Sequence, residues 1–154
     1  MKRMWALMAV AGVVLSTSGC EREKNQVDAE VRRLCKQDGG ISVHETIVLS
    51  GSSFDKFGVV QVPLRRNAKP SDAFFYEWET TYIKRGNPEM WRNHFRLTRV
   101  KDGKLLGEVI SYTRRGGDLP GPWHESSFTC PPDGDISTLK QRVFAKTVGG
   151  PGNE

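Results

Sequence analysis

The densest group of side chains capable of chemistry in this sequence lies in one glycine- and proline-rich loop. Arg114, Arg115, Asp118, Trp123 and His124 supply two guanidinium groups, a carboxylate, an indole and an imidazole within eleven residues. Guanidinium groups bind carboxylates and phosphates through paired hydrogen bonds, and an indole can stack on a sugar or hold a side chain of a partner. The pattern predicts that this loop binds a partner.

The same loop also has a structural interpretation, in which none of these groups meets a ligand. The Gly-Gly pair at 116–117 suits a turn, Asp118 can cap that turn or pair with an arginine, and Trp123 can close one end of the core. The spacing of Asp118 and His124 matches no known metal motif, and the sequence has no phosphate-binding loop, nucleophile elbow or paired-cysteine motif. We therefore predict no catalytic residue, no metal and no cofactor, and both roles of the loop stay open.

A row of aromatic residues marks the clearest strand, FFYEWETTYI at residues 74–83. Side chains alternate between the two faces of a strand, so the aromatic residues share one face. That face carries Phe74, Tyr76, Trp78, Thr80 and Tyr82. We expect this row to face the core, because large aromatic side chains are most often buried there, and a ligand platform is the alternative.

Periodicity and turn residues predict the remaining elements. Apolar residues at helical spacing predict helices over residues 25–38 and 135–144. Alternating or β-rich segments predict strands over residues 41–49, 58–64 and 126–130, and a hairpin over residues 95–112. Glu45 falls on the apolar side of its strand, so either a cation pairs with it or a bulge turns it outward.

The hairpin at residues 95–112 turns at Asp102-Gly103, and two registers are possible. A two-residue loop places an apolar residue opposite Glu108. A loop one residue longer, with Gly103 in the left-handed conformation, places Phe95 opposite Val109 and Arg96 opposite Glu108. The second register pairs an apolar residue with an apolar residue and a positive charge with a negative charge. We therefore predict the second register.

The first nineteen residues have the layout of a secretory signal. Lys2 and Arg3 precede an apolar run over residues 4–14, and small and polar residues then lead to Cys20. The run is too short for a membrane span, which takes about 20 apolar residues.

The end of this signal, Ser18-Gly19-Cys20, resembles the lipobox of bacterial lipoproteins, in which small residues precede an invariant cysteine. Thr17 stands where that family usually has Leu. The resemblance implies a diacylglyceryl group on the Cys20 thiol, cleavage before Cys20 and acylation of the new amine, with palmitate as the kind of acyl chain. The alternative is an ordinary secretory signal that is cut nearby and leaves Cys20 free.

A lipidated Cys20 leaves an even pair of cysteines, Cys35 and Cys130. In an exported protein we expect these two thiols to form a disulfide. The bridge closes a loop of 95 residues. The chain-entropy model assigns such a loop about 4–5 kcal/mol of stabilisation.

Net charge excludes one class of partner. The formal net charge falls from +5 to +3 on cleavage, because Lys2 and Arg3 leave with the signal. This small excess favours anionic lipid head groups slightly. Together with export, it argues against nucleic acid as a partner.

The whole mature chain resembles a group of small proteobacterial lipoproteins to which no activity is attached. The resemblance rests on four segments, Cys35-x-x-Asp38-Gly39-Gly40, Glu45-Thr46, Tyr112-x-Arg114-Arg115-Gly116-Gly117-Asp118 and Phe128-x-Cys130-Pro131. It supports the Cys35–Cys130 bridge and a shared fold, and it assigns no catalytic role to any residue.

Together these elements predict an α+β fold. It consists of an N-terminal helix, an antiparallel sheet of about five strands and a C-terminal helix, with the disulfide joining the first helix to the last strand. We divide the chain into a lipoprotein signal peptide (1–19), a lipidated tether (20–24), a single domain (25–146) and a flexible tail (147–154).

The sequence favours a protein of the cell envelope that is anchored by lipid on Cys20 and faces the periplasm. In enteric lipoproteins, Asp after the lipidated cysteine retains a protein in the inner membrane, whereas Glu21 stands here, so we expect the outer membrane. The expected function is non-enzymatic binding or scaffolding of an envelope protein or a cell-wall partner. Two alternatives stay open: an accessory or exclusion lipoprotein of a mobile element, and a cell-wall hydrolase.

Overall fold

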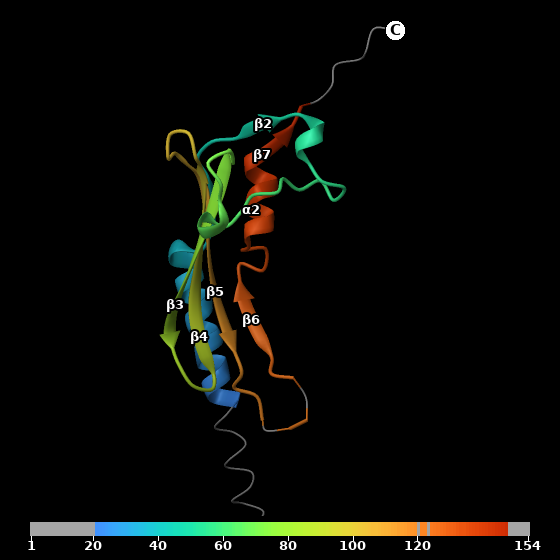
Figure 1. The fold of residues 1–154 in the computed structure, drawn as a ribbon. Coiled ribbons are helices and arrows are strands. Elements are labelled where there is room, and N and C mark those ends of the chain that lie inside the picture. Colours follow the sequence, from blue (N-terminus) through green and yellow to red (C-terminus); the bar gives the residue numbers. More distant parts are fainter. Residues whose placement is uncertain (1–20, 120, 123, 148–154) are drawn as a thin grey trace, which may run out of the picture.

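The α+β architecture is confirmed in the computed structural model, which describes residues 21–119, 121–122 and 124–147 (Figure 1). Residues 21–38 are helical. The elements that follow are β1 (Gly40–Val43), β2 (Ile47–Leu49), η1 (Gly51–Ser53), η2 (Arg65–Asn67), β3 (Phe74–Lys84), β4 (Glu89–Arg99), β5 (Leu105–Arg115), β6 (Ser127–Cys130), α2 (Ile136–Val143) and β7 (Phe144–Lys146).

The main sheet has five antiparallel strands and is built on β3, β4 and β5, each of 11 residues. Its order is β1-β5-β4-β3, and β6 also pairs with β5, beyond the end of β1. The predicted hairpin register is confirmed, because Phe95 pairs with Val109 and Arg96 pairs with Glu108. Gly103 has a φ of 67°, the left-handed conformation that this turn requires.

The two helices cover opposite faces of the sheet at opposite ends of the molecule. At the lower end in Figure 1, Val31 of the N-terminal helix packs in one cluster with Met90 and Tyr112. At the upper end, Leu139 of α2 lies against Gly107. Gly107 and Tyr112 are five residues apart on β5, so they point to opposite faces.

Two buried clusters therefore stabilise the domain instead of one. The upper cluster contains Val60, Val62, Leu97, Leu106, Val109, Leu139, Val143 and Phe144. The lower cluster contains Val27, Val31, Cys35, Met90 and Tyr112. The predicted disulfide between Cys35 and Cys130 is present, and it joins the last turn of the N-terminal helix to β6.

Several sequence expectations differ from the structure. The expected strand at 41–49 is split, because β1 joins β5 whereas β2 pairs in parallel with β7 in a separate two-stranded sheet. The expected strand at 58–64 is wrong, since only isolated bridges occur there, at Val60 and Leu64. The expected helix at 135–144 ends at Val143, because Phe144 begins β7. In the first and third cases the non-local pairing of β2 with β7 outweighs the local pattern.

The split at residues 44–46 also settles the position of Glu45. Its carboxylate lies 2.7 Å from Nη1 of Arg99 and 2.6 Å from Nζ of Lys104, so cations pair with it, as the first alternative proposed. These two contacts hold the pKa of Glu45 below its ordinary value, with the hydrogen bond from Lys104 the larger cause.

The expected tether does not fit the structure at residues 21–24, which are helical. Glu23 pairs with Lys84 at 3.1 Å, and Lys24 pairs with Asp118, so the first turn is tied to the domain. The signal peptide, Cys20 and the last seven residues of the tail lie outside the described residues.

Candidate functional site

Arg114, the first member of the candidate loop, is directed into the protein. Its side chain is 3% exposed, and its Nε lies 2.7 Å from Oδ1 of Asp28 on the N-terminal helix. Its Nη1 donates to the carbonyl oxygens of Gly116 and Ser126, at 2.8 and 2.9 Å, and to the Ser126 hydroxyl at 2.8 Å. The guanidinium therefore joins helix, strand and loop, and the predicted partner contact does not fit this residue.

Asp118 also serves the fold. It pairs with Lys24 of the N-terminal helix, and it accepts hydrogen bonds from the amide and hydroxyl of Ser126 at 2.6 and 2.8 Å. The Lys24 contact is the main reason why the pKa of Asp118 lies well below its ordinary range, followed by the Ser126 bonds. The structural alternative thus holds for Asp118, with a lysine instead of an arginine as its partner.

The other members of the loop lie differently. Arg115 is exposed and pairs with Glu125 at 3.2 Å, and His124 is exposed as well. Trp123 lies outside the described residues. Only Arg115 and His124 of the described candidates therefore face solvent, and the described members of the loop do not assemble into one site.

The most distinctive surface of the described domain lies on the lower half of the sheet, on the face opposite the N-terminal helix. We call it the open aromatic face and define it by Trp78, Thr80 and Tyr82 of β3 with Trp91, Asn93 and Phe95 of β4. Cross-strand pairing sets Trp78 beside Phe95, Thr80 beside Asn93 and Tyr82 beside Trp91. No described helix packs on this half, since α2 reaches only the upper half (Figure 1).

The aromatic residues of this face form two pairs. The rings of Trp78 and Phe95 are stacked, with centroids 5.7 Å apart, and those of Tyr82 and Trp91 are tilted at 6.0 Å. Four residues along a strand separate Trp78 from Tyr82 by about 13 Å. Trp78 and Tyr82 are nevertheless 57% and 44% exposed, so the expected core position is wrong for them.

The upper part of the same aromatic row agrees with the core prediction. Phe74 and Tyr76 are partly buried against the upper cluster, and the rings of Phe74 and Phe144 lie 4.9 Å apart. The row is therefore a core face in its first half and an exposed platform in its second half.

Hydrogen-bonding groups lie between the two aromatic pairs. Oδ1 of Asn93 accepts from the Thr80 hydroxyl at 2.8 Å and from Nε1 of Trp78 at 3.3 Å. None of the six residues that define the face is ionisable at neutral pH. A surface with rings and amide or hydroxyl groups suits the binding of a partner.

Sequence reasoning missed two of the six residues of this face, Trp91 and Asn93, because it did not predict the first part of β4. Glu89–His94 belong to β4, which pairs with β3 across the turn after Lys84. Residues 90–94 (MWRNH) show no alternation of apolar and polar side chains, so the local pattern carried no strand signal there.

Two histidines and a glutamate form a separate cluster on the other face. Nε2 of His94 lies 2.7 Å from the Glu108 carboxylate, and Nε2 of His44 lies 3.5 Å from it. The His94 hydrogen bond is the main reason why the pKa of Glu108 is lowered. Among the described residues, no three His, Cys, Asp or Glu side chains are arranged to hold a metal ion.

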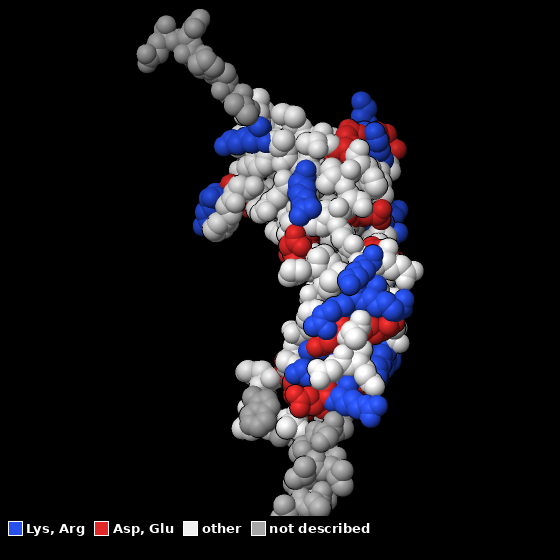
Figure 2. Space-filling model, turned by 180° about the vertical axis from the view of Figure 1, so that it is seen from behind, with Lys and Arg blue, Asp and Glu red and all other residues white. Residues whose placement is uncertain are grey.

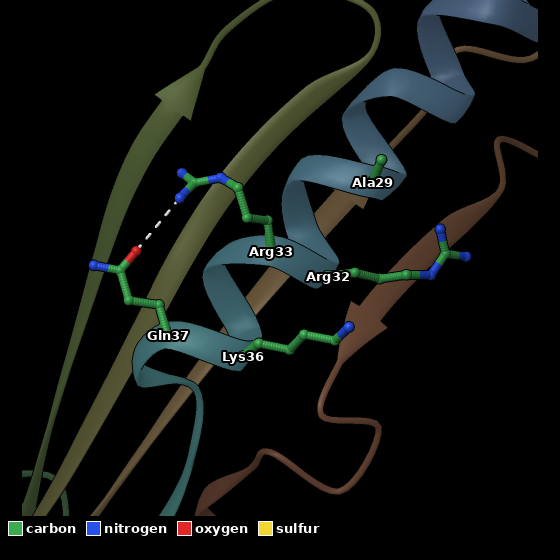
Figure 3. Close-up of a pocket in the computed structure, with 5 residues that line it drawn as sticks. All are labelled: Ala29, Arg32, Arg33, Lys36 and Gln37. Atoms are coloured by element: carbon green, nitrogen blue, oxygen red, sulfur yellow. Dashed lines mark hydrogen bonds between the residues drawn. The ribbon is translucent and has the colours of Figure 1, made fainter.

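The outer side of the N-terminal helix carries a basic groove lined by Ala29, Arg32, Arg33, Lys36 and Gln37 (Figure 3). Arg33 makes a bidentate pair with Glu30 at 2.7 and 2.8 Å, and Arg32 lies 4.5 Å from the Phe128 ring centroid. Figure 2, which views the molecule from behind, shows acidic side chains interspersed with the basic ones. The groove therefore belongs to a mixed, solvated surface.

Comparisons with known proteins assign no family to this chain. No protein-family model matches it, and no curated protein or solved structure matches it significantly. Within the described part of the chain, no helix has the length and hydropathy needed to cross a bilayer.

Proposed function

We propose that this protein is a lipid-anchored protein of the bacterial cell envelope that binds a partner without catalysis, through the open aromatic face. One observation carries the proposal: Trp78 and Tyr82 are 57% and 44% exposed on a half of the sheet that no described helix covers. Clustered exposed aromatic residues on a folded domain mark interaction sites, because burying them is favourable.

The surroundings of the face also suit a partner. Arg115 of β5 lies opposite Glu89 of β4 in the strand register, on the same side of the sheet as Trp91. It therefore borders the open aromatic face at its lower end. An uncharged centre with a charged border is the usual arrangement of a binding surface. Arg115 is thus the member of the predicted loop that this proposal retains, with exposed His124 as a further candidate.

The proposed anchor would hold the domain close to the membrane. A lipidated Cys20 would directly precede residue 21, which is already helical and tied to the domain through Glu23 and Lys24. The protein would then face the periplasm with little slack, and Glu21 favours the outer membrane.

Crosslinking in the producing bacterium tests the binding role. We expect the double variant Trp78→Ala/Tyr82→Ala of the full chain to lose its crosslinks to one defined envelope component, while its thermal unfolding stays close to that of the wild type. Phe57→Ala is the matched control, because Phe57 is an aromatic residue that is 76% exposed in a loop away from this face. Equal crosslinking by the double variant and the wild type would refute the proposed site.

A further inference from the structure

We propose that the open edge of β3 binds an extended polypeptide segment, which joins the sheet as an additional strand beside Trp78–Tyr82. The inference rests on the proposed function and deepens it, because the added strand would extend the open aromatic face. The proposed partner is a polypeptide segment of another envelope protein.

β3 is an edge strand, and no described strand pairs with the outer edge of its lower half. β4 pairs with it on one side, and on the other side the described backbone contacts are those of Pro63 and Leu64 with Tyr76. Every residue over 78–83 is exposed. Natural proteins usually protect a long edge strand with proline, inward-pointing charges or a covering segment, and between Trp78 and Ile83 only Glu79 is charged.

The backbone N–H and C=O groups of alternate residues in β3 point away from β4. The Tyr76 amide donates to the Pro63 carbonyl oxygen at 3.0 Å, so it points away from β4. The register with β4 is continuous over Phe74–Tyr82, and backbone groups alternate between the two edges of a strand. The N–H and C=O groups of Trp78, Thr80 and Tyr82 therefore point to the open edge, at intervals of about 7 Å.

The chemistry of the open edge of β3 determines which partner it binds. A row of alternating N–H and C=O groups at this spacing is matched by the backbone of another strand, which gives each group a partner. The same three residues carry their side chains on the open aromatic face, so alternate side chains of the added strand would lie beside Trp78 and Tyr82. On the other face, Glu79 favours a Lys or Arg side chain opposite it.

The geometry also argues against a second copy as the occupant. Antiparallel pairing of two copies through this edge would turn one molecule end over end. The N-terminal helix begins at the same end of the molecule as the turn between β3 and β4 (Figure 1). The two proposed anchors would then lie at opposite ends of the pair, so both reach one bilayer only when the pair lies flat on it.

The probe for a binding experiment is a synthetic peptide with the sequence of residues 76–84, YEWETTYIK. When the peptide pairs antiparallel with its fifth residue, a threonine, opposite Thr80, its tryptophan lies beside Tyr82. Its second tyrosine, the seventh residue, then lies beside Trp78. With the full chain held in lipid nanodiscs, we expect saturable binding of the labelled peptide. Hydrogen exchange should then slow at the amides of Trp78, Thr80 and Tyr82 and stay unchanged at Thr81.

Thr80→Pro isolates the role of the edge. Proline at this position removes an N–H group that points outward, so the pairing with β4 should survive. We expect peptide affinity to fall about tenfold or more, because one interstrand hydrogen bond is lost and the ring obstructs the edge. Thr80→Val is the comparison variant, since it also loses the hydroxyl but keeps the amide, and the further fall in affinity from Thr80→Val to Thr80→Pro measures the contribution of the edge.

Each alternative result has a defined meaning. No peptide binding by the wild type, or equal affinity for Thr80→Pro and the wild type, would overturn the inference. Dimers of the full chain that Thr80→Pro dissociates would assign the edge to a second copy. Binding of cell-wall oligosaccharides that Trp78→Ala abolishes and Thr80→Pro leaves unchanged would refute strand addition but preserve the proposed function.

Discussion

Arg114 illustrates how the environment of one residue decides its role. Its guanidinium contacts Asp28, 86 residues away in sequence, and two loop carbonyls, so it fixes three segments relative to one another. The adjacent Arg115 has the same chemistry, yet its side chain is 59% exposed. Alternation along β5 separates the two, because neighbours on a strand face opposite sides.

Replacing Arg114 should therefore destabilise the protein strongly. We expect Arg114→Ala to lower the free energy of unfolding by about 3–5 kcal/mol, because it leaves Asp28 largely buried without its counter-charge. Urea unfolding of the oxidised protein measures this. Arg115→Ala is the control and should change the stability by less than about 0.5 kcal/mol, as expected for an exposed pair. Equal effects of the two substitutions would contradict this role of Arg114.

Asp118 predicts how stability depends on pH. Its pKa in the folded protein lies below the ordinary value of 3.8, chiefly because of the hydrogen bond from Lys24. A depressed carboxyl pKa stabilises the folded state fully above the unfolded pKa, and this contribution is lost as the pH falls below it. Denaturation curves across the acid range should show this loss, and Asp118→Asn should flatten it. An unchanged acid dependence in that variant would mean that other carboxylates are responsible.

At the scale of elements, the contacts of the N-terminal helix and of α2 differ in part. α2 approaches β5 so closely that a Cβ on Gly107 would lie 3.1 Å from side-chain atoms of Leu139 and Val143. The N-terminal helix also packs through Val31 against Met90 and Tyr112, and the Arg114–Asp28 pair and a disulfide hold it in addition. Close packing fixes both helices, and specific bonds add to it at the N-terminal helix.

The disulfide should contribute strongly to stability through the length of its loop. Cys35 and Cys130 are 95 residues apart, and removing the bridge should lower the free energy of unfolding by about 4–5 kcal/mol in the chain-entropy model. Denaturant unfolding with and without reductant tests this. The variant Cys35→Ser/Cys130→Ser should show the lower stability and no response to reductant, whereas a reductant effect in this variant would have another source.

For the whole molecule, the position of the helices leaves the sheet unequally covered. Each helix shields one face over about half the length of the sheet, and the face opposite the N-terminal helix carries exposed Trp78 and Tyr82. The other uncovered region lies around His44, His94 and Glu108. Its side chains are polar, and both histidines contact the Glu108 carboxylate. The uncharged region is therefore the one for which a partner is expected.

The proposed anchoring also concerns the whole molecule. We expect intact-mass analysis to show a chain that begins at a lipidated Cys20, and membrane fractionation to place it with the envelope. Cys20→Ser should move the protein to the soluble fraction, because the lipid chains supply its affinity for the bilayer. The variant Cys35→Ser/Cys130→Ser keeps Cys20 and should stay with the membrane. An unprocessed, unmodified leader would refute the anchor.

Much of the fold followed from local patterns in the sequence. Alternation predicted β3, turn chemistry and pair matching predicted the β4–β5 register, and the cysteine count predicted the disulfide. These features depend on residues close in sequence or on the chemistry of one residue type. The candidate loop was recognised by composition, but composition could not tell that Arg114 and Asp118 bind Asp28 and Lys24 of the N-terminal helix.

The sequence by itself thus determined which residues could form strands and which face of each strand they share. Only the tertiary structure decided which faces and edges are covered, because that depends on contacts between segments far apart in the chain. The sequence favoured a core position for the aromatic row of β3, which holds for Phe74 and Tyr76 but not for Trp78 and Tyr82, because α2 packs only on the upper half of this face. Burial is set by neighbouring elements, and no local pattern contains them.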